Sequence, residues 1–157
     1  MAMEWKIRYD ASMLESAREA LLVLLASAGT VISLYFTALA YRWVTPDSAS
    51  IPAFCRMGEQ TCATVIDSPR ARMFGLPNSL LGLLYYAGLL TLLGSGRLGS
   101  PPWIWLALIT SAGTVGLGAF LTYSLLFLTR IPCRLCFTSH AINLVLFILL
   151  LRDSSFL

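Results

Sequence analysis

Residues 103–128 read WIWLALITSAGTVGLGAFLTYSLLFL, an apolar run without a charged side chain. A helix of this length, rising about 1.5 Å per residue, can cross roughly 30 Å of hydrocarbon. Further apolar runs lie at about residues 20–44, 76–93 and 133–151. Only helices and closed barrels satisfy their backbone polar groups in lipid, and runs as continuous as these are helical. The sequence therefore predicts an all-α membrane protein, a bundle of four transmembrane helices.

The composition agrees with a membrane protein. Hydrophobic residues make up 57% of the chain and charged residues only 12%, whereas soluble domains average roughly 45–50% and about 25%. The basic residues behind the net charge of +3 are scattered, so we expect no nucleic-acid partner. Seven charged residues in the first twenty positions, before a long apolar run, indicate an uncleaved signal anchor. We expect one integral membrane domain over residues 1–157.

All four cysteines are predicted to lie on one face of the membrane. An even number of spans places both termini on one side and the loops after spans one and three on the other. The first of these loops, about residues 45–75, holds Cys55 and Cys62, while Cys133 and Cys136 open the fourth span. Loops of about 30 residues are uncommon unless they are functional. The apolar side chains of this loop predict a short amphipathic helix or cap over the bundle.

Charge does not distinguish the two faces. The terminal face carries five Lys and Arg residues and the cysteine face carries six, so the positive-inside rule finds no asymmetry. Disulfides persist in oxidising compartments. We therefore place the cysteines on the extracytoplasmic side of a multi-pass protein of the cell (inner) membrane, surrounded by lipid.

The cysteine spacing favours one of three pairings, Cys55 with Cys62 and Cys133 with Cys136. The second pair opens a helix, where the helix dipole and two nearby arginines favour the thiolate. The thiolate is the species that attacks a disulfide or a quinone. The alternatives are cysteines that only fill space in the core, and a zinc site. Unequal spacing and a place at the membrane surface disfavour zinc, and we expect no metal.

Three polar side chains accompany the cysteines. His140 lies about one turn beyond Cys136 and could donate a hydrogen bond or a proton to a quinone carbonyl; alternatively, a neighbouring helix satisfies it. Asn78 opens the second span, where its amide could bind a quinone oxygen or cap the helix. For Asn143 we expect a hydrogen bond between helices.

The third span is rich in small residues. They are Ala112, Gly113, Gly116, Gly118 and Ala119. Small residues let helices approach closely in lipid, so we expect close packing here. A slot for a quinone is the alternative interpretation.

The chain resembles the vitamin K epoxide reductase family, including its bacterial members, from about Cys55 to Asn143. Cys55 and Cys62 are similar to the loop pair of that family. Residues 72–76 (RMFGL) resemble a signature in its cap, and residues 77–82 (PNSLLG) resemble the start of its second span. Residues 133–143 (CRLCFTSHAIN) resemble its active-site helix. The motifs occur in the same order as in the family.

The resemblance implies a relay of electrons through the four sulfurs. Cys136 is the cysteine that meets the quinone, and Cys133 is its partner. Cys62 exchanges disulfides with Cys133, and Cys55 faces an external thiol protein. The implied activity is that of a thiol oxidoreductase that supports disulfide bond formation.

The resemblance also implies ligands and a partner. Asn78 and His140 would flank the oxygens of a quinone, which is ubiquinone, menaquinone or a related molecule. Vertebrate members have tyrosine where His140 stands and an aromatic residue where Ile66 stands, so the ligand contacts differ here. Many bacterial members carry a fused thioredoxin-like domain, and for this chain we expect a separate thioredoxin-like partner.

Three other functions stay open at the level of sequence. The same sulfurs could reduce a quinone or a quinone epoxide in an enzyme whose physiological product is the reduced quinone. Thiols could instead bind or transport a metal. A third candidate, the unrelated four-span bacterial disulfide generator, usually has its CxxC motif in the first loop, whereas here the motif opens the fourth span.

Overall fold

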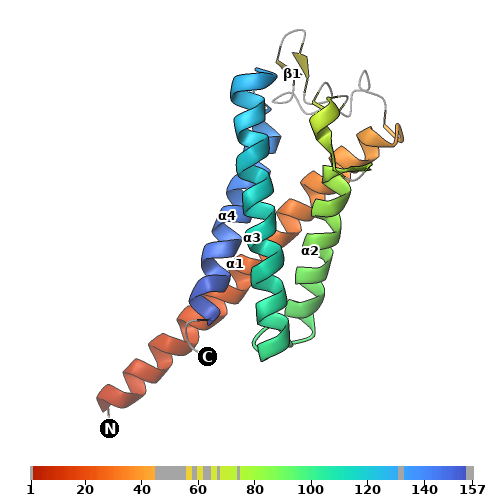
Figure 1. Ribbon diagram of the computed structural model, residues 1–157. Helices are drawn as coiled ribbons and strands as arrows, with labels where there is room; N and C mark the ends of the chain where they lie inside the picture. Colours follow the sequence, from red (N-terminus) through yellow and green to blue (C-terminus); the bar gives the residue numbers. More distant parts are fainter. Residues whose placement is uncertain are drawn as a thin grey trace.

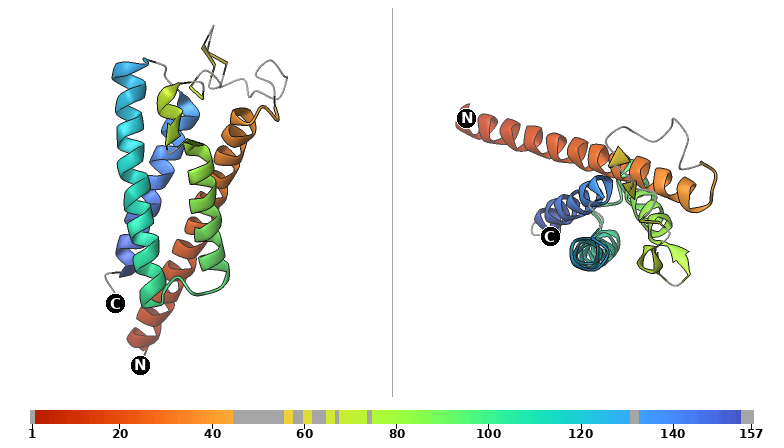
Figure 2. Two further views of the ribbon diagram at one scale, coloured as in Figure 1. Left: turned by 45° about the vertical axis from the view of Figure 1, so that its right-hand side comes forward. Right: turned by 90° about the horizontal axis from the view of Figure 1, so that it is seen from above.

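The computed structural model describes residues 2–44, 56–57, 60–61, 65–66, 68–73, 75–130 and 133–154. Helices dominate this part of the chain and run alternately up and down (Figures 1 and 2). They are α1 Ala2–Ala40, α2 Asn78–Gly94, α3 Pro101–Tyr123 and α4 Arg134–Ser154. The start of α1 and the end of α4 therefore lie at one end of the bundle, and the start of α4 lies at the other.

Three described helical stretches are long and apolar enough to cross a membrane. They are Met13–Ala40, Pro101–Leu128 and Arg134–Arg152, in the predicted first, third and fourth spans. The helix α2 is also apolar but has only 17 residues, which cover roughly 26 Å. Its role as the second of four spans remains a prediction.

The first helix ends before the predicted boundary near residue 44. The N–H of Trp43 bonds to the carbonyl of Ala38 at 2.8 Å, and the N–H of Arg42 bonds to the carbonyl of Leu39 at 3.1 Å. With Arg42 at a φ of 60°, this is a Schellman motif, which stops a helix. The helix α2 ends in the same way at Gly96, which has a φ of 66°.

The sequence predicts a short amphipathic helix or a cap for the loop after α1, and the described residues of this loop form a cap against the bundle. These described residues contain no α-helix but form two short antiparallel strand pairs and one 3-10 turn. These are β1 Arg56–Met57 with β2 Gln60–Thr61, β3 Arg72–Met73 with β4 Leu76–Pro77, and η2 Pro69–Ala71. Gly75, with a φ of 81°, turns the chain between β3 and β4. In its described residues the cap is thus built from short strands and turns, and it leads directly into α2.

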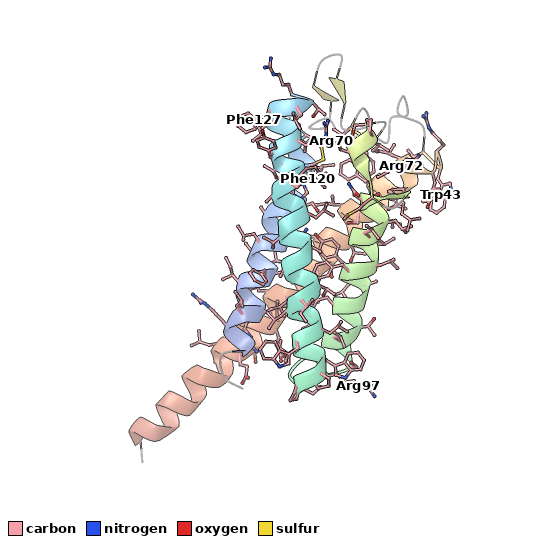
Figure 3. The ribbon with its side chains drawn as sticks, viewed as in Figure 1. Trp43, Arg70, Arg72, Arg97, Phe120 and Phe127 are labelled. Atoms are coloured by element: carbon pink, nitrogen blue, oxygen red, sulfur yellow. A yellow bond between two sulfur atoms is a disulfide. The ribbon has the colours of Figure 1, made fainter. Side chains whose placement is uncertain are left out.

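The buried side chains form two clusters along the bundle. The larger one joins all four helices away from the cysteines and includes Leu22, Tyr86, Ile104, Leu146 and Leu150. The smaller one lies at the cysteine end and consists of Phe36, Leu39, Leu125 and Cys133. Many large apolar side chains point outward, as Figure 3 shows for Phe120 and Phe127 on one side of the bundle. Such a surface would promote association in water but is ordinary in contact with lipid.

The small residues of α3 serve close packing at one position only. Gly118 is buried, and a Cβ there would approach the ring of His140. The other four small residues of the stripe are exposed in the described chain. The prediction of close packing is therefore wrong for most of the stripe, because these residues face away from the neighbouring helices.

Candidate active site

A disulfide joins Cys133 and Cys136, with the two Cα atoms 5.3 Å apart. This is the pairing that the spacing predicts. Cys133 directly precedes α4, and its carbonyl accepts a hydrogen bond from the N–H of Phe137 at 3.1 Å, which starts the helix. The N–H of Cys136 lies 3.3 Å from Sγ of Cys133 and donates to it. After reduction this N–H would favour the thiolate of Cys133 over the thiol.

The two sulfurs have different surroundings. Cys133 is 1% exposed and packs in the cluster with Phe36, Leu39 and Leu125. Cys136 is half-buried and, unlike Cys133, lines a cavity between the helices. Cys133 is therefore shielded by apolar side chains, whereas Cys136 lies beside the cavity.

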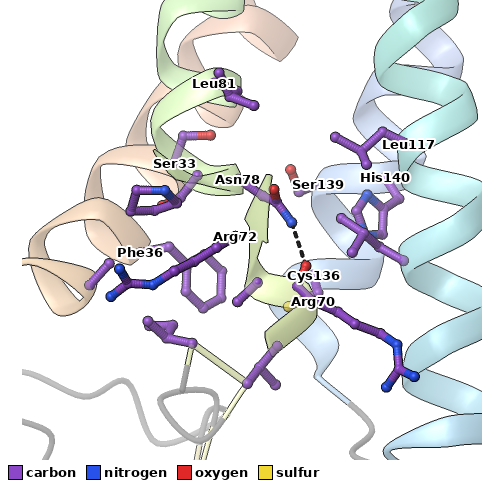
Figure 4. A pocket seen from close by; sticks show the side chains of 18 of the residues that line it. Ser33, Phe36, Arg70, Arg72, Asn78, Leu81, Leu117, Cys136, Ser139 and His140 are labelled. Carbon is purple, nitrogen blue, oxygen red and sulfur yellow. Dashed lines mark hydrogen bonds between the residues drawn. The ribbon is translucent and has the colours of Figure 1, made fainter. Parts of the chain in front are cut away.

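The cavity has a volume of about 170 Å³ and lies between all four helices and the cap. Its walls are mostly apolar and include Ile32, Phe36, Ile66, Leu81, Leu117 and Leu121. Polar groups gather on one side, where Figure 4 shows Asn78, Cys136, Ser139 and His140 converging. The arrangement suits a flat apolar ligand with a few hydrogen-bonding atoms.

The end of α3 completes this wall. The helix passes into a π-helical turn, η3 Ser124–Leu128, in which the N–H of Thr129 bonds to the carbonyl of Ser124 at 2.9 Å. Ser124 and Leu125 line the cavity, and Leu125 also contacts the cluster of Cys133. Such turns occur often at functional sites, because they re-aim side chains within a helix.

Asn78 does not cap α2. The helix has Pro77 at its N-cap and no side-chain cap bond. Instead, Nδ2 of Asn78 donates to the backbone carbonyl of Arg70 in the cap at 2.8 Å (Figure 4). Oδ1 of Asn78 is buried and has no hydrogen-bond partner within the described chain. An unpaired buried acceptor is costly, so this oxygen has capacity for a hydrogen bond from a donor outside the described chain.

His140 has a similar orphaned atom. Its Nδ1 is buried and lacks a hydrogen-bond partner among the described residues. A Cβ at Gly118 would come within 3.0 Å of this nitrogen, so the glycine makes room for the ring. The alternative of a histidine satisfied by a neighbouring helix therefore does not hold at Nδ1.

Tyr86, Ser139 and Asn143 form a polar group between α2 and α4 that was not predicted from sequence. The hydroxyl of Tyr86 donates to Oδ1 of Asn143 at 2.6 Å and lies 3.4 Å from Oγ of Ser139. The prediction that Asn143 bonds between helices is confirmed. Two sequence spacings could have indicated this group. Tyr86 lies two turns beyond Asn78 on α2, and Ser139 lies one turn beyond Cys136 on α4.

The predicted loop cysteines, Cys55 and Cys62, lie outside the described residues. Their described neighbours in the chain are Arg56 of β1 and Thr61 of β2. A little further along the loop, Val65 and Ile66 pack against the cluster that contains Cys133. Arg70 and Arg72 line the cavity from the cap, and Figure 3 shows both at the end of the bundle opposite Arg97.

A disulfide at the start of a membrane-length helix, with one of its cysteines lining an apolar cavity, is the arrangement expected of a membrane thiol oxidoreductase. The chain belongs to the vitamin K epoxide reductase family, whose family model matches residues 20–151, most of the sequence. This confirms the resemblance seen in the motifs. Members of the family are multi-pass membrane oxidoreductases that act on thiols and are linked to quinones in general. No curated protein matches the chain.

Proposed function

We propose that the protein passes two electrons from a thioredoxin-like protein to a quinone and thereby supports disulfide bond formation. One observation carries this proposal: Cys136, Asn78 and His140 line the same apolar cavity. Asn78 and His140 each also have a buried polar atom without a hydrogen-bond partner in the described chain. A redox-active disulfide beside apolar walls and polar side chains suits a quinone headgroup. Its carbonyl oxygens can accept from an N–H of Asn78 or His140, and Oδ1 of Asn78 can accept from the hydroxyl of the reduced form.

The cavity fits that headgroup in size and chemistry. Its volume of about 170 Å³ suits one substituted ring rather than a whole prenylated molecule. Nδ2 of Asn78 has a second hydrogen beyond the one given to Arg70, and this hydrogen is available for a carbonyl oxygen. A bound quinone supplies a two-electron acceptor that takes up two protons. The side chains contribute position and a low dielectric.

The electron path uses the four cysteines in order. A thiolate of the partner attacks the Cys55–Cys62 disulfide, and the freed Cys62 attacks Cys133 and releases the thiol of Cys136. The second thiol of the partner attacks the mixed disulfide at Cys55, so the partner leaves as a disulfide and Cys55 is freed. The thiolate of Cys55 then attacks Cys62, which restores the loop disulfide and leaves Cys133 and Cys136 as two thiols. These thiols lose two electrons and two protons to the acceptor, and their disulfide forms again. Each step exchanges one sulfur–sulfur bond for another or transfers one electron pair.

The position of the cap supports the exchange between Cys62 and Cys133. Val65 and Ile66 pack on the cluster around Cys133. Cys62 precedes Val65 by three residues, and three residues span at most about 11 Å. Cys133 is buried in the oxidised pair, so this exchange requires the side chains that cover it to move.

The proposed arrangement in the membrane follows from the chemistry. We place the cysteine end on the extracytoplasmic side of the cell membrane, where disulfides persist. The helix α2 is then the second of four crossings. The thioredoxin-like partner meets the cap, and the quinone enters from the lipid.

Purified protein, incubated with a reduced thioredoxin-like protein and a short-chain quinone, tests this proposal by quinone absorbance. We expect the quinone signal to decline, and we expect Cys136→Ala and Cys62→Ala to abolish the decline. Thr138→Ala is the control, because Thr138 is exposed on α4 and bonds only to the backbone of its own helix. Turnover that survives both cysteine changes would reject the relay.

A further inference from the structure

Tyr86 is held by three helices. Its side chain is 1% exposed, and its ring lies against Gly29 of α1, where a Cβ would overlap the ring. Its hydroxyl reaches α4 and donates to Oδ1 of Asn143 at 2.6 Å. Tyr86 therefore has little freedom to turn, and its hydroxyl direction is set.

The hydrogen bond from Tyr86 to Asn143 determines which atom donates in the contact between Tyr86 and Ser139. A phenol has one hydrogen, and that of Tyr86 is used on Oδ1 of Asn143, which can only accept. In the contact of 3.4 Å between Tyr86 and Ser139, the serine must therefore donate. Ser139 lines the cavity. With its one hydrogen on Tyr86, Ser139 presents only lone pairs to a ligand.

We propose that Tyr86 is a positioning residue that makes Ser139 a hydrogen-bond acceptor, so that the cavity binds a hydroquinone more tightly than the quinone. A quinone oxygen has no hydrogen and meets the lone pairs of Ser139 without a bond. A hydroquinone hydroxyl has a hydrogen and can donate it to Ser139. This inference rests on the proposed quinone function and adds a preference between the two redox forms.

The preference would assist the oxidation of the cysteines. When a site binds the reduced form of a ligand more tightly, the bound ligand becomes a stronger oxidant, because binding and reduction are linked. A tenfold preference corresponds to about 30 mV for two electrons. The hydroxyl pair of Tyr86 and Ser139 would thus favour disulfide formation at Cys133 and Cys136.

The test measures binding rather than turnover. In a full-length Cys136→Ser background, which cannot exchange electrons with the ligand, a decyl-substituted benzoquinone and its hydroquinone are titrated anaerobically, with tryptophan fluorescence as readout. We expect tighter binding of the hydroquinone. Tyr86→Phe should lower this preference by about three- to tenfold, the value of one hydrogen bond, mainly because the freed hydroxyl of Ser139 can donate to the quinone.

Two further variants connect the effect to Ser139. Ser139→Ala leaves the Tyr86–Asn143 bond in place and should also remove the preference, after which Tyr86→Phe should change the ratio no further. Tyr41→Phe is the control, because Tyr41 is exposed and does not line the cavity.

Each outcome decides between the two proposals. A ratio of the two affinities that is unchanged in both Tyr86→Phe and Ser139→Ala overturns the inference and leaves the quinone function standing. A background protein that binds neither form contradicts the quinone function itself, and the inference fails with it.

Discussion

The imidazole of His140 occupies the space that Gly118 leaves on the facing helix. A Cβ at Gly118 would lie 3.0 Å from Nδ1 of His140, closer than ordinary carbon contacts, so the two residues fit together across α3 and α4. The glycine is therefore part of the site, although it cannot touch a ligand through a side chain.

Substitution of this glycine should disturb the ligand site through His140. Gly118→Ala should shift the ring by a few tenths of an ångström and raise the KM for quinone about three- to tenfold, since a hydrogen bond contributes about 0.5–1.5 kcal/mol. Gly113→Ala, on the same helix with no atom near the added methyl group, should leave the KM unchanged. An equal quinone KM for Gly118→Ala and Gly113→Ala would show that the position of the His140 ring does not affect quinone binding.

His140 itself can be tested for two roles with two substitutions. His140→Phe removes both the hydrogen bond and the proton, and it should raise the quinone KM or slow reduction, by about a hundredfold if the proton matters. His140→Gln keeps a hydrogen-bonding group and should restore the KM but not the rate. Unchanged kinetics in His140→Phe would make the residue structural.

Asn78 should matter for the ligand more than for folding. Asn78→Leu keeps the approximate size but removes both amide atoms, so we expect the quinone KM to rise about tenfold or more. Thr91→Ala, at the other end of α2, removes a hydroxyl that bonds within its own helix and serves as control. Quinone kinetics that are the same in both variants would show that the amide of Asn78 does not bind the quinone.

The contact between Gly29 and Tyr86 predicts an effect on stability. Gly29→Ala adds a methyl group that overlaps the buried ring, and overpacking of this kind costs about 1–3 kcal/mol. Gly88→Ala, in an exposed part of α2 with no neighbouring atom, should be neutral or slightly stabilising. Thermal unfolding in detergent measures both, and an unchanged Tm for Gly29→Ala would contradict the packing described.

The parts of the structure that sequence could predict are those that depend on local pattern. Apolar runs predicted the membrane-length helices because lipid requires internal backbone hydrogen bonds. The spacing of Cys133 and Cys136 predicted their bond, because residues three apart share a helix face. The position of Asn143 on this face also predicted a bond between helices.

Other features depend on tertiary arrangement, and sequence alone could not supply them. Asn78 bonds to a backbone carbonyl of the cap, and that partner depends on the path of the loop. Gly118 faces His140 while its small neighbours face outward, which only the packing of α3 on α4 decides. Tyr86 was missed because its partners lie on another helix, more than fifty residues away in the chain.

The central claim is that Cys62 can reach Cys133, and a trapped disulfide tests it most directly. The double variant Cys55→Ala/Cys136→Ala leaves these two cysteines alone in the chain. After mild oxidation in membranes, mass spectrometry of non-reduced peptides should find Cys62 joined to Cys133 within one chain. Two free thiols, or bridges only between separate chains, would contradict the account.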